Sequence, residues 1–197
     1  VLRLTEELEV PLRERNLLLA AAGYAAAFPE RGLDDPAMAP AREAIELVLA
    51  GHEPFPALAI DRHWHLVSAN QAAMRLMGGV PAALVAPPVN VLRLSLHPEG
   101  LARRIVNLSE WRAHILARLR QQAEVSADPG TAALLAELQA LPMPGGLPFR
   151  PQAAPALPAL TLQLATEAGV LSFITTTMVF GTPLDVTLAE LAIEAFY

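Results

Sequence analysis

The sequence contains no cysteine, and all 14 of its basic residues are arginine rather than lysine. Without cysteine the chain cannot form a disulfide, a thiolate zinc site or a thiol nucleophile, which fits a cytoplasmic protein. No stretch reaches about 18 consecutive strongly apolar residues, and no signal-peptide pattern opens the chain, so no membrane contact is expected. A net charge of −6 argues against nucleic-acid binding by these residues themselves, because phosphate neutralisation needs clustered cations.

Charged residues are also scarce, at 17%, whereas hydrophobic residues make up 53% of the 197. This composition excludes a disordered chain, and the length allows one good core with a small appended unit. Val1 is not an initiator methionine, so we expect the chain to be a fragment of a longer protein.

The stretch from Phe55 to Met77 predicts two strands followed by a helix. Residues 57–60 are apolar and lead into the polar pair Asp61–Arg62, which suits a turn. Residues 63–69 then alternate between two faces, the period of a half-buried strand. Asn70 is expected to cap a helix that ends at Gly78–Gly79.

The N-terminal part of the chain predicts two helices and a connector. Residues 1–23 are expected to form one helix, and residues 24–33 an irregular connector. Asp35 followed by Pro36 is an N-cap with proline in the first turn, and the helix that it starts should end at Gly51.

The middle of the chain predicts a loop at residues 78–88 and three further helices. The first covers residues 89–96. The second starts at Asn107, which has the capping-box spacing to Glu110, and runs to about Val125. The third starts at the Asp128–Pro129 pair and stops at Pro142.

The helix after Asn107 has an apolar stripe and an arginine-rich side. The stripe should contain Leu108, Trp111, Ile115 and Leu119. Arg112, Arg118 and Arg120 are expected on or near the opposite side.

The C-terminal part predicts three strands after a proline-rich segment. Residues 142–158 are expected to be an exposed connector or a lid, and the most mobile part of the chain. Residues 161–166 and 170–180 read as a β-hairpin with its turn at residues 167–169. Residues 191–197 alternate and predict a final strand, with a helix as the alternative.

Two strands early and three late, with helices between them, predict an α+β fold. We expect an antiparallel five-stranded sheet with a helical insert, preceded by N-terminal helices. This order of elements is PAS-like.

Three stretches carry a resemblance to a known family: VPLRERNLLLAAAGYAAAFPERGLDDPAM at residues 10–38, HEPFPALAIDRHWHLVSANQAA at 52–73, and FGTPLDVTLAELAIEAFY at 180–197. The chain resembles bacterial transcription regulators that carry a xenobiotic-response-element-type helix-turn-helix and a C-terminal MmyB-like (PAS-like) ligand-binding domain.

The resemblance implies that the DNA-binding head is missing and should precede Val1. Residues 1–33 would be the end of that head with its connector, and residues 34–197 the ligand-binding domain. It also implies a small apolar effector such as a fatty acid, and contact with DNA only through the missing head. The helix from Asp35 to Ala50 would couple the two parts.

Large or adaptable residues on faces that we expect to point inward are the candidate ligand-binding residues. They are Trp64, Met74, Met77, Trp111, Ile115, Phe173 and Met178. Methionine suits pockets for flexible apolar ligands, and PAS-like sheets commonly leave a cavity under their helices. The alternative interpretation is ordinary filled core.

Other kinds of site have little support in the sequence. His63 and His65 could share a metal, but Asp61 is the one further ligand nearby, so no metal site is expected. No nucleophile turn or phosphate loop occurs, so we expect neither an enzyme nor a cofactor. The prediction is therefore an effector-sensing domain of a transcription regulator, and the alternative is a ligand-free dimerisation module that forms a homodimer.

Overall fold

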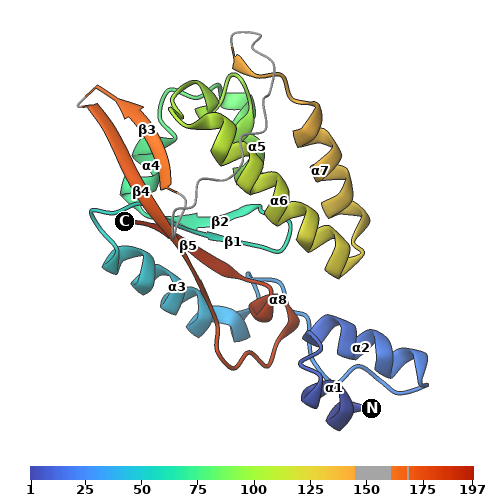
Figure 1. Cartoon of the computed structure of the whole chain (residues 1–197). Coiled ribbons are helices and arrows are strands. Elements are labelled where there is room, and N and C mark those ends of the chain that lie inside the picture. The colour runs from blue at the N-terminus through green and yellow to red at the C-terminus, as the bar shows by residue number, and fades with distance from the viewer. Residues whose placement is uncertain (145–160, 168) are drawn as a thin grey trace.

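The computed structural model describes residues 1–144, 161–167 and 169–197. Five strands form one antiparallel sheet in the order β2–β1–β5–β4–β3 (Figure 1). The strands are β1 (Ala57–Ile60), β2 (Leu66–Ala69), β3 (Thr161–Thr166), β4 (Gly169–Val179) and β5 (Ala192–Phe196). This sheet, with helices inserted between β2 and β3, confirms the predicted PAS-like α+β fold.

The described helices lie before the first strand and between the strands of the sheet. They are α1 (Leu2–Glu7), α2 (Leu12–Ala21), α3 (Ala39–Gly51), α4 (Gln71–Leu76), α5 (Val91–Leu96), α6 (Leu108–Ser126), α7 (Pro129–Ala140) and α8 (Val186–Ala189). Short 3₁₀ turns occur at Pro36–Met38, Ala82–Leu84 and Leu101–Arg103. None of these helices is both long and apolar enough to cross a membrane.

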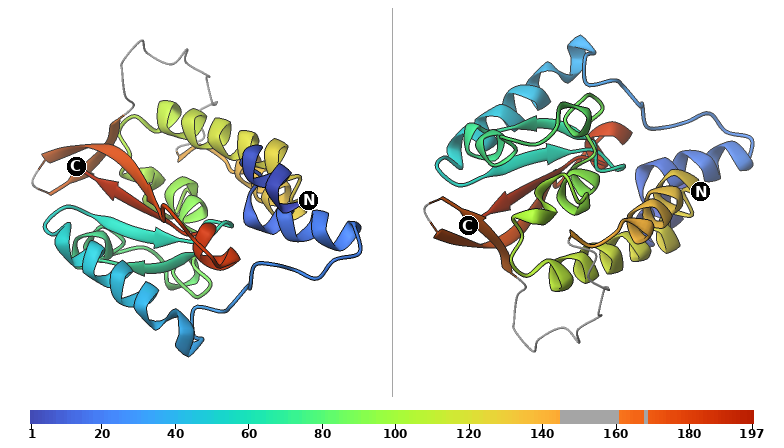
Figure 2. Two further views of the ribbon diagram at one scale, coloured as in Figure 1. Left: turned by 90° about the horizontal axis from the view of Figure 1, so that it is seen from below. Right: turned by 90° about the horizontal axis from the view of Figure 1, so that it is seen from above.

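The two faces of the sheet are covered by different helices. α5, α6 and α7 lie over one face, and α3 lies against the other (Figures 1 and 2). Alternation along β1 explains the division, because Leu58 and Ile60 enter the α6-side core whereas Ala57 and Ala59 contact the α3 side.

Several local predictions are confirmed. The side chains of Asp35, Asn70 and Asp128 each accept a hydrogen bond from a backbone N–H in the first turn that follows. The hairpin of β3 and β4 pairs down to Thr166 and Gly169, and the C-terminal alternation forms a strand rather than a helix. The predicted proline-rich connector falls largely on residues 145–160, outside the described residues.

The strand predicted to start at residue 63 starts at Leu66 instead. The Asp61 carboxylate accepts bonds from the backbone N–H groups of His63 and His65, both at 2.8 Å. Trp64 between them has a φ of 65°, in the left-handed region. The side chain of Asp61 therefore folds residues 61–65 into a turn, which the alternating pattern alone could not reveal.

The single helix predicted for residues 1–23 is wrong, because the chain forms two helices there. α1 ends at Glu7, Glu9 has a φ of 50°, and Pro11 precedes α2. Proline disfavours helical conformation in the residue before it, which separates the two helices.

The predicted capping box at the start of α6 is also wrong. The Asn107 amide makes no cap and bonds instead to the edge strand β3. Its Nδ2 donates to the Thr161 carbonyl at 2.7 Å, and its Oδ1 accepts from the Gln163 N–H at 3.0 Å. A side-chain amide matches the spacing of a backbone peptide, so this long-range pairing replaces the local cap.

Arg112 does not lie on the exposed side of α6 as predicted. It is buried, and its Nη2 donates to the carbonyls of Leu138 and Gln139, both at 3.0 Å. These carbonyls belong to the last turn of α7 and have no partner within that helix. Arg112 therefore joins α6 to the C-terminal end of α7.

Candidate functional site

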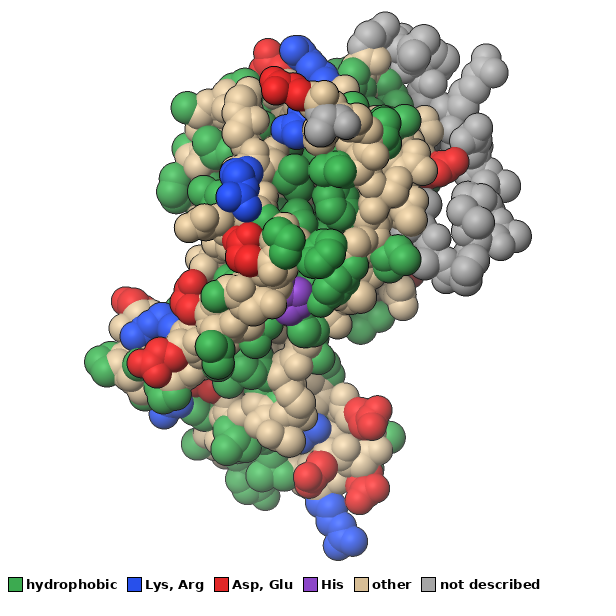
Figure 3. Space-filling model, turned by 90° about the vertical axis from the view of Figure 1, so that its left-hand side faces the viewer, with side chains coloured by type: hydrophobic (Ala, Val, Ile, Leu, Met, Phe, Trp, Pro, Cys, Tyr) green, Lys and Arg blue, Asp and Glu red, His purple; other side chains and the backbone are tan. Residues whose placement is uncertain are grey.

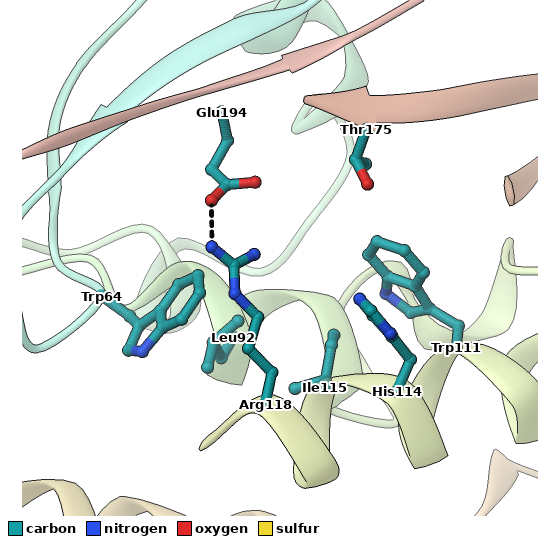
Figure 4. A pocket seen from close by; sticks show the side chains of 8 residues that line it. All are labelled: Trp64, Leu92, Trp111, His114, Ile115, Arg118, Thr175 and Glu194. Carbon is teal, nitrogen blue, oxygen red and sulfur yellow. Dashed lines mark hydrogen bonds and ion pairs between the residues drawn. The ribbon is translucent and has the colours of Figure 1, made fainter. Parts of the chain in front are cut away.

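A small cleft lies between α6 and the sheet (Figure 4). Its volume is about 30 Å³, and it is lined by Trp64, Leu92, Trp111, His114, Ile115, Arg118, Thr175 and Glu194. The α6 residues are spaced by three or four along the helix, which places them on one face. Thr175 and Glu194 face them from the neighbouring strands β4 and β5.

Both tryptophans of the chain line this cleft, and their indole N–H groups are bonded. Trp64 Nε1 donates to Gln122 Oε1 at 2.8 Å, and Trp111 Nε1 donates to Ser95 Oγ at 2.9 Å. The polar edge of each indole is thereby satisfied, so the rings present apolar surface to the cleft.

An ion pair crosses the cleft from α6 to the sheet. Arg118 Nη2 lies 2.7 Å from Glu194 Oε1, and the Thr177 hydroxyl donates to the same oxygen at 3.0 Å. The guanidinium of Arg118 also lies over the Trp64 ring, 4.6 Å from its centroid, a cation–π geometry. Glu194 is only 5% exposed although it carries a charge, so the pair with Arg118 is what makes its burial tolerable.

His114 stands beside Trp111 at the mouth of the cleft, with ring centroids 5.9 Å apart (Figure 4). Its partial burial, together with the positive charge of Arg118, lowers the pKa of the imidazole below its ordinary value, although Glu194 acts in the opposite direction. The ring is therefore neutral at neutral pH.

A wider, open groove adjoins the cleft and shares Trp64 and Arg118 with it. Its volume is about 420 Å³, and its other lining residues are Ile60, Asp61, Arg62, Gln121, Gln122, Val125, Glu190 and Ala192. Arg62 in this groove donates to Asp128 at 2.8 Å and to Glu190 at 3.3 Å. Its charge is therefore matched by neighbouring carboxylates.

The structure brings five of the seven predicted ligand-binding residues into the α6-side core. Trp64, Trp111 and Ile115 line the cleft itself. Phe173 is buried in the same core, and Met77 packs against it.

The other two predicted residues lie elsewhere. Met74 is 54% exposed, and Met178 packs against the α3-side cluster on the opposite face of the sheet. They cannot line one pocket with the remaining five in this arrangement.

Sequence reasoning missed the polar residues of the cleft. Arg118 is seven residues after Trp111, so helical spacing places both on one face of α6. Glu194 lies between Ala192 and Phe196 in the alternation of β5. Both of these neighbours contact the α6-side core. Periodicity could therefore have predicted that Glu194 points inward, since only its charge suggested otherwise.

His63 and His65 lie outside the cleft, with ring centroids 6.0 Å apart. His65 Nδ1 is 3.1 Å from Asp61 Oδ2, and His63 Nδ1 is 3.6 Å from Asp128 Oδ2. Within residues 1–144, 161–167 and 169–197, no group of three or more His, Cys, Asp or Glu side chains is placed to hold a metal ion.

Comparisons with known proteins give a matching family model and similar solved structures. Residues 41–197 match the family model described as MmyB-like transcription regulator ligand binding domain. A similar solved structure is a domain of the sensory box sensor histidine kinase/response regulator from Geobacter sulfurreducens. It is 13% identical, with a TM-score of 0.32, and the match covers 84% of this chain and 98% of that one. No curated protein matches the sequence.

Proposed function

The chain belongs to the MmyB-like transcription regulator ligand-binding domains, and from that premise we propose that it senses a small apolar ligand of the fatty-acid type and couples ligand binding to DNA binding. The role is one of binding rather than catalysis, within a cytoplasmic regulator. We place the boundary between the end of the DNA-binding head with its connector and the ligand-binding domain after residue 33.

The observation that carries this proposal is the cleft between α6 and the sheet. Its walls are two tryptophans, an isoleucine and a leucine, and a few polar groups converge on it. Such a combination is typical of small-molecule sites, because apolar walls supply affinity and polar groups fix orientation. Each methylene buried there would contribute about 0.8 kcal/mol.

The size of the cleft sets the mechanism of uptake. A volume of about 30 Å³ is roughly a tenth of the smallest typical ligand pocket, about 300 Å³. A medium-chain ligand therefore fits only if α6 moves away from the sheet. We infer that the stacking of Arg118 on Trp64 holds the closed arrangement and is lost when α6 moves, whereas the pair between Arg118 and Glu194 is kept. A ligand that binds only the open arrangement shifts the population toward it.

Contacts beside the groove support coupling to the N-terminal helices. Arg13 on α2 lies 2.7 Å from Glu190 and also pairs with Glu30. Glu190 in turn contacts Arg62 in the groove next to the cleft. A displacement of the groove residues would therefore change the contacts of α2 directly.

Further bonds join the connector to the start of α8. Arg31 lies 3.1 Å from Asp185, and the Val186 N–H donates to the Pro29 carbonyl at 2.9 Å. The helix first expected to provide the coupling, α3, lies on the opposite face of the sheet. We infer that the contact between α2 and α8 provides the shorter route from the cleft to the N-terminal helices.

Replacing Thr175 by Trp tests the ligand site, with Thr176→Trp as the matched control. Thr175 points into the cleft, whereas Thr176 is the next residue of β4 and faces outward, exposed to solvent. We expect Thr175→Trp to lower affinity for 1-decanol and decanoate on the order of tenfold, measured by native mass spectrometry. The control should bind as the parent does. Binding of neither compound to the parent would contradict the proposal.

Dimerisation without a ligand is the second candidate function, and an apolar patch favours it. Figure 3 shows hydrophobic side chains gathered over the centre of the face that carries the C-terminus. Phe55, Ile174 and Tyr197 are 44%, 49% and 47% exposed, and the rings of Phe55 and Tyr197 lie 5.6 Å apart. An Ile174→Arg variant that turns a sedimenting dimer into a monomer, in a parent that binds no ligand, would favour this function over sensing.

A further inference from the structure

Glu194 offers the cleft one carboxylate oxygen that no described residue bonds. Arg118 Nη2 and the Thr177 hydroxyl both donate to Oε1 of this carboxylate. Figure 4 shows the second oxygen pointing toward the side of the cleft where Thr175 lies. This oxygen reaches the cleft, so a donor group of a ligand could bond to it there.

The charges around the cleft already balance without a ligand. Arg118 contributes one positive charge and Glu194 one negative charge, and the two are paired at 2.7 Å. His114 on α6 adds no positive charge at neutral pH, because partial burial and Arg118 lower the pKa of its imidazole. A carboxylate brought into this space would leave two negative charges facing one arginine beside the buried Glu194.

The volume of the closed cleft suits a small polar group. A space of about 30 Å³ exceeds the roughly 10–15 Å³ that one water needs, and water has about the size of a hydroxyl group. A hydroxyl could donate to Glu194 Oε2 and accept a bond from the Thr175 hydroxyl, which also lines the cleft.

We propose that Glu194 selects the polar end of the ligand, and that this end is an uncharged hydrogen-bond donor such as a hydroxyl rather than a free carboxylate. This inference rests on the proposed function, since it names the head group of the same apolar ligand. The alkyl chain would extend between α6 and the sheet once the closed arrangement opens.

The two tryptophans provide the measurement, because both line the cleft and the chain has no others. The intact 197-residue chain is titrated with 1-decanol and with decanoate at pH 8, where decanoate is ionised, and tryptophan fluorescence is followed. We expect the alcohol to bind on the order of tenfold more tightly than the carboxylate. Equal or tighter binding of decanoate would overturn the inference.

A Glu194→Gln variant assigns the preference to this residue. Replacing the carboxylate by an amide removes the negative charge and frees Arg118, so decanoate should gain affinity and the two ligands should bind within about threefold. Circular dichroism checks that the variant folds. If the variant does not fold, the ratio of the parent's affinities for 1-decanol and decanoate still decides whether the site prefers the alcohol.

Two failures are distinguishable in this titration. A fluorescence response to both ligands with no preference for the alcohol contradicts the head-group inference and leaves the ligand site standing. No response to either ligand contradicts the ligand site, and the inference falls with it.

Discussion

The two faces of the sheet come from the same alternating strands, yet their packing differs. On the α3 side, Ala57, Ala59 and Ala195 are 0–1% exposed, and their small side chains let Ile45 and Leu49 approach closely. On the α6 side, bulky side chains and the ion pair between Arg118 and the buried Glu194 separate the helix from the strands.

This difference explains where a ligand can be accommodated. Small residues pack without gaps, since the helix can settle onto the strand backbone. Two indole rings and a guanidinium are rigid and planar, so they leave residual space between α6 and the sheet. The comparison predicts that α3 keeps its place on the sheet when a ligand binds, whereas α6 moves.

Enlarging a side chain on each face should give the largest contrast. Ala59→Leu on the α3 side is expected to cost about 1–3 kcal/mol of unfolding free energy, because the site has no room for the added atoms. Thr175→Leu on the α6 side should cost less than about 1 kcal/mol, since its side chain enters the cleft. Urea unfolding measures both, and equal costs would remove the distinction between the faces.

Removing the helix caps on the two faces should give an intermediate effect. Asp128→Ala is expected to cost about 0.5–2 kcal/mol, because Asp128 caps α7 and also pairs with Arg62. Asp35→Ala, ahead of α3, should lower the free energy of unfolding by less, since within the described residues the Asp35 side chain makes only the cap bond from the Ala37 N–H. Thermal melts of the two variants provide the comparison.

The contribution of Asp128 to the free energy of unfolding should depend on pH. The N–H of Thr131 lowers the pKa of this carboxyl, with further help from the Thr131 hydroxyl and Arg62, against the opposing effect of burial. Because the folded-state pKa is lowered, the stabilisation is present above the unfolded value of about 3.9 and is lost as pH falls through the folded one. The difference between parent and Asp128→Ala should therefore shrink in acid.

The smallest effect should come from His114. Since the pKa of His114 is lowered in the folded state, the unfolded chain takes up a proton first as pH falls below about 6.5. The parent should therefore lose slightly more stability than His114→Gln between neutral pH and pH 5, in urea titrations. Parallel curves for the two proteins would contradict this placement of the ring.

The sequence predicted those features that depend on neighbours along the chain. A run of apolar residues located β1, alternation located β3 and β5, and Asp35, Asn70 and Asp128 cap as their positions suggested. These features succeed because hydrogen bonds to the next turn or strand are nearly independent of the rest of the fold.

The failures share a long-range cause. Asn107 bonds to β3 and Arg112 to the end of α7, so partners far along the chain replaced the local role that each pattern indicated. Met74 was expected to point inward but faces solvent, because the buried face of α4 is formed by Ala72 and Ala73 and Met74 lies beside it. The paired Arg118 and Glu194 could be found only once both α6 and β5 were placed.

Hydrogen–deuterium exchange along α6 tests the central claim most directly, because the claim requires this helix to leave the sheet when a ligand enters. On adding 1-decanol to the intact chain, exchange of the backbone amides of α6, residues 108–126, should change, whereas α3, residues 39–51, should exchange as before. Unchanged exchange in α6 while the ligand is bound, or equal changes in both helices, would contradict the account.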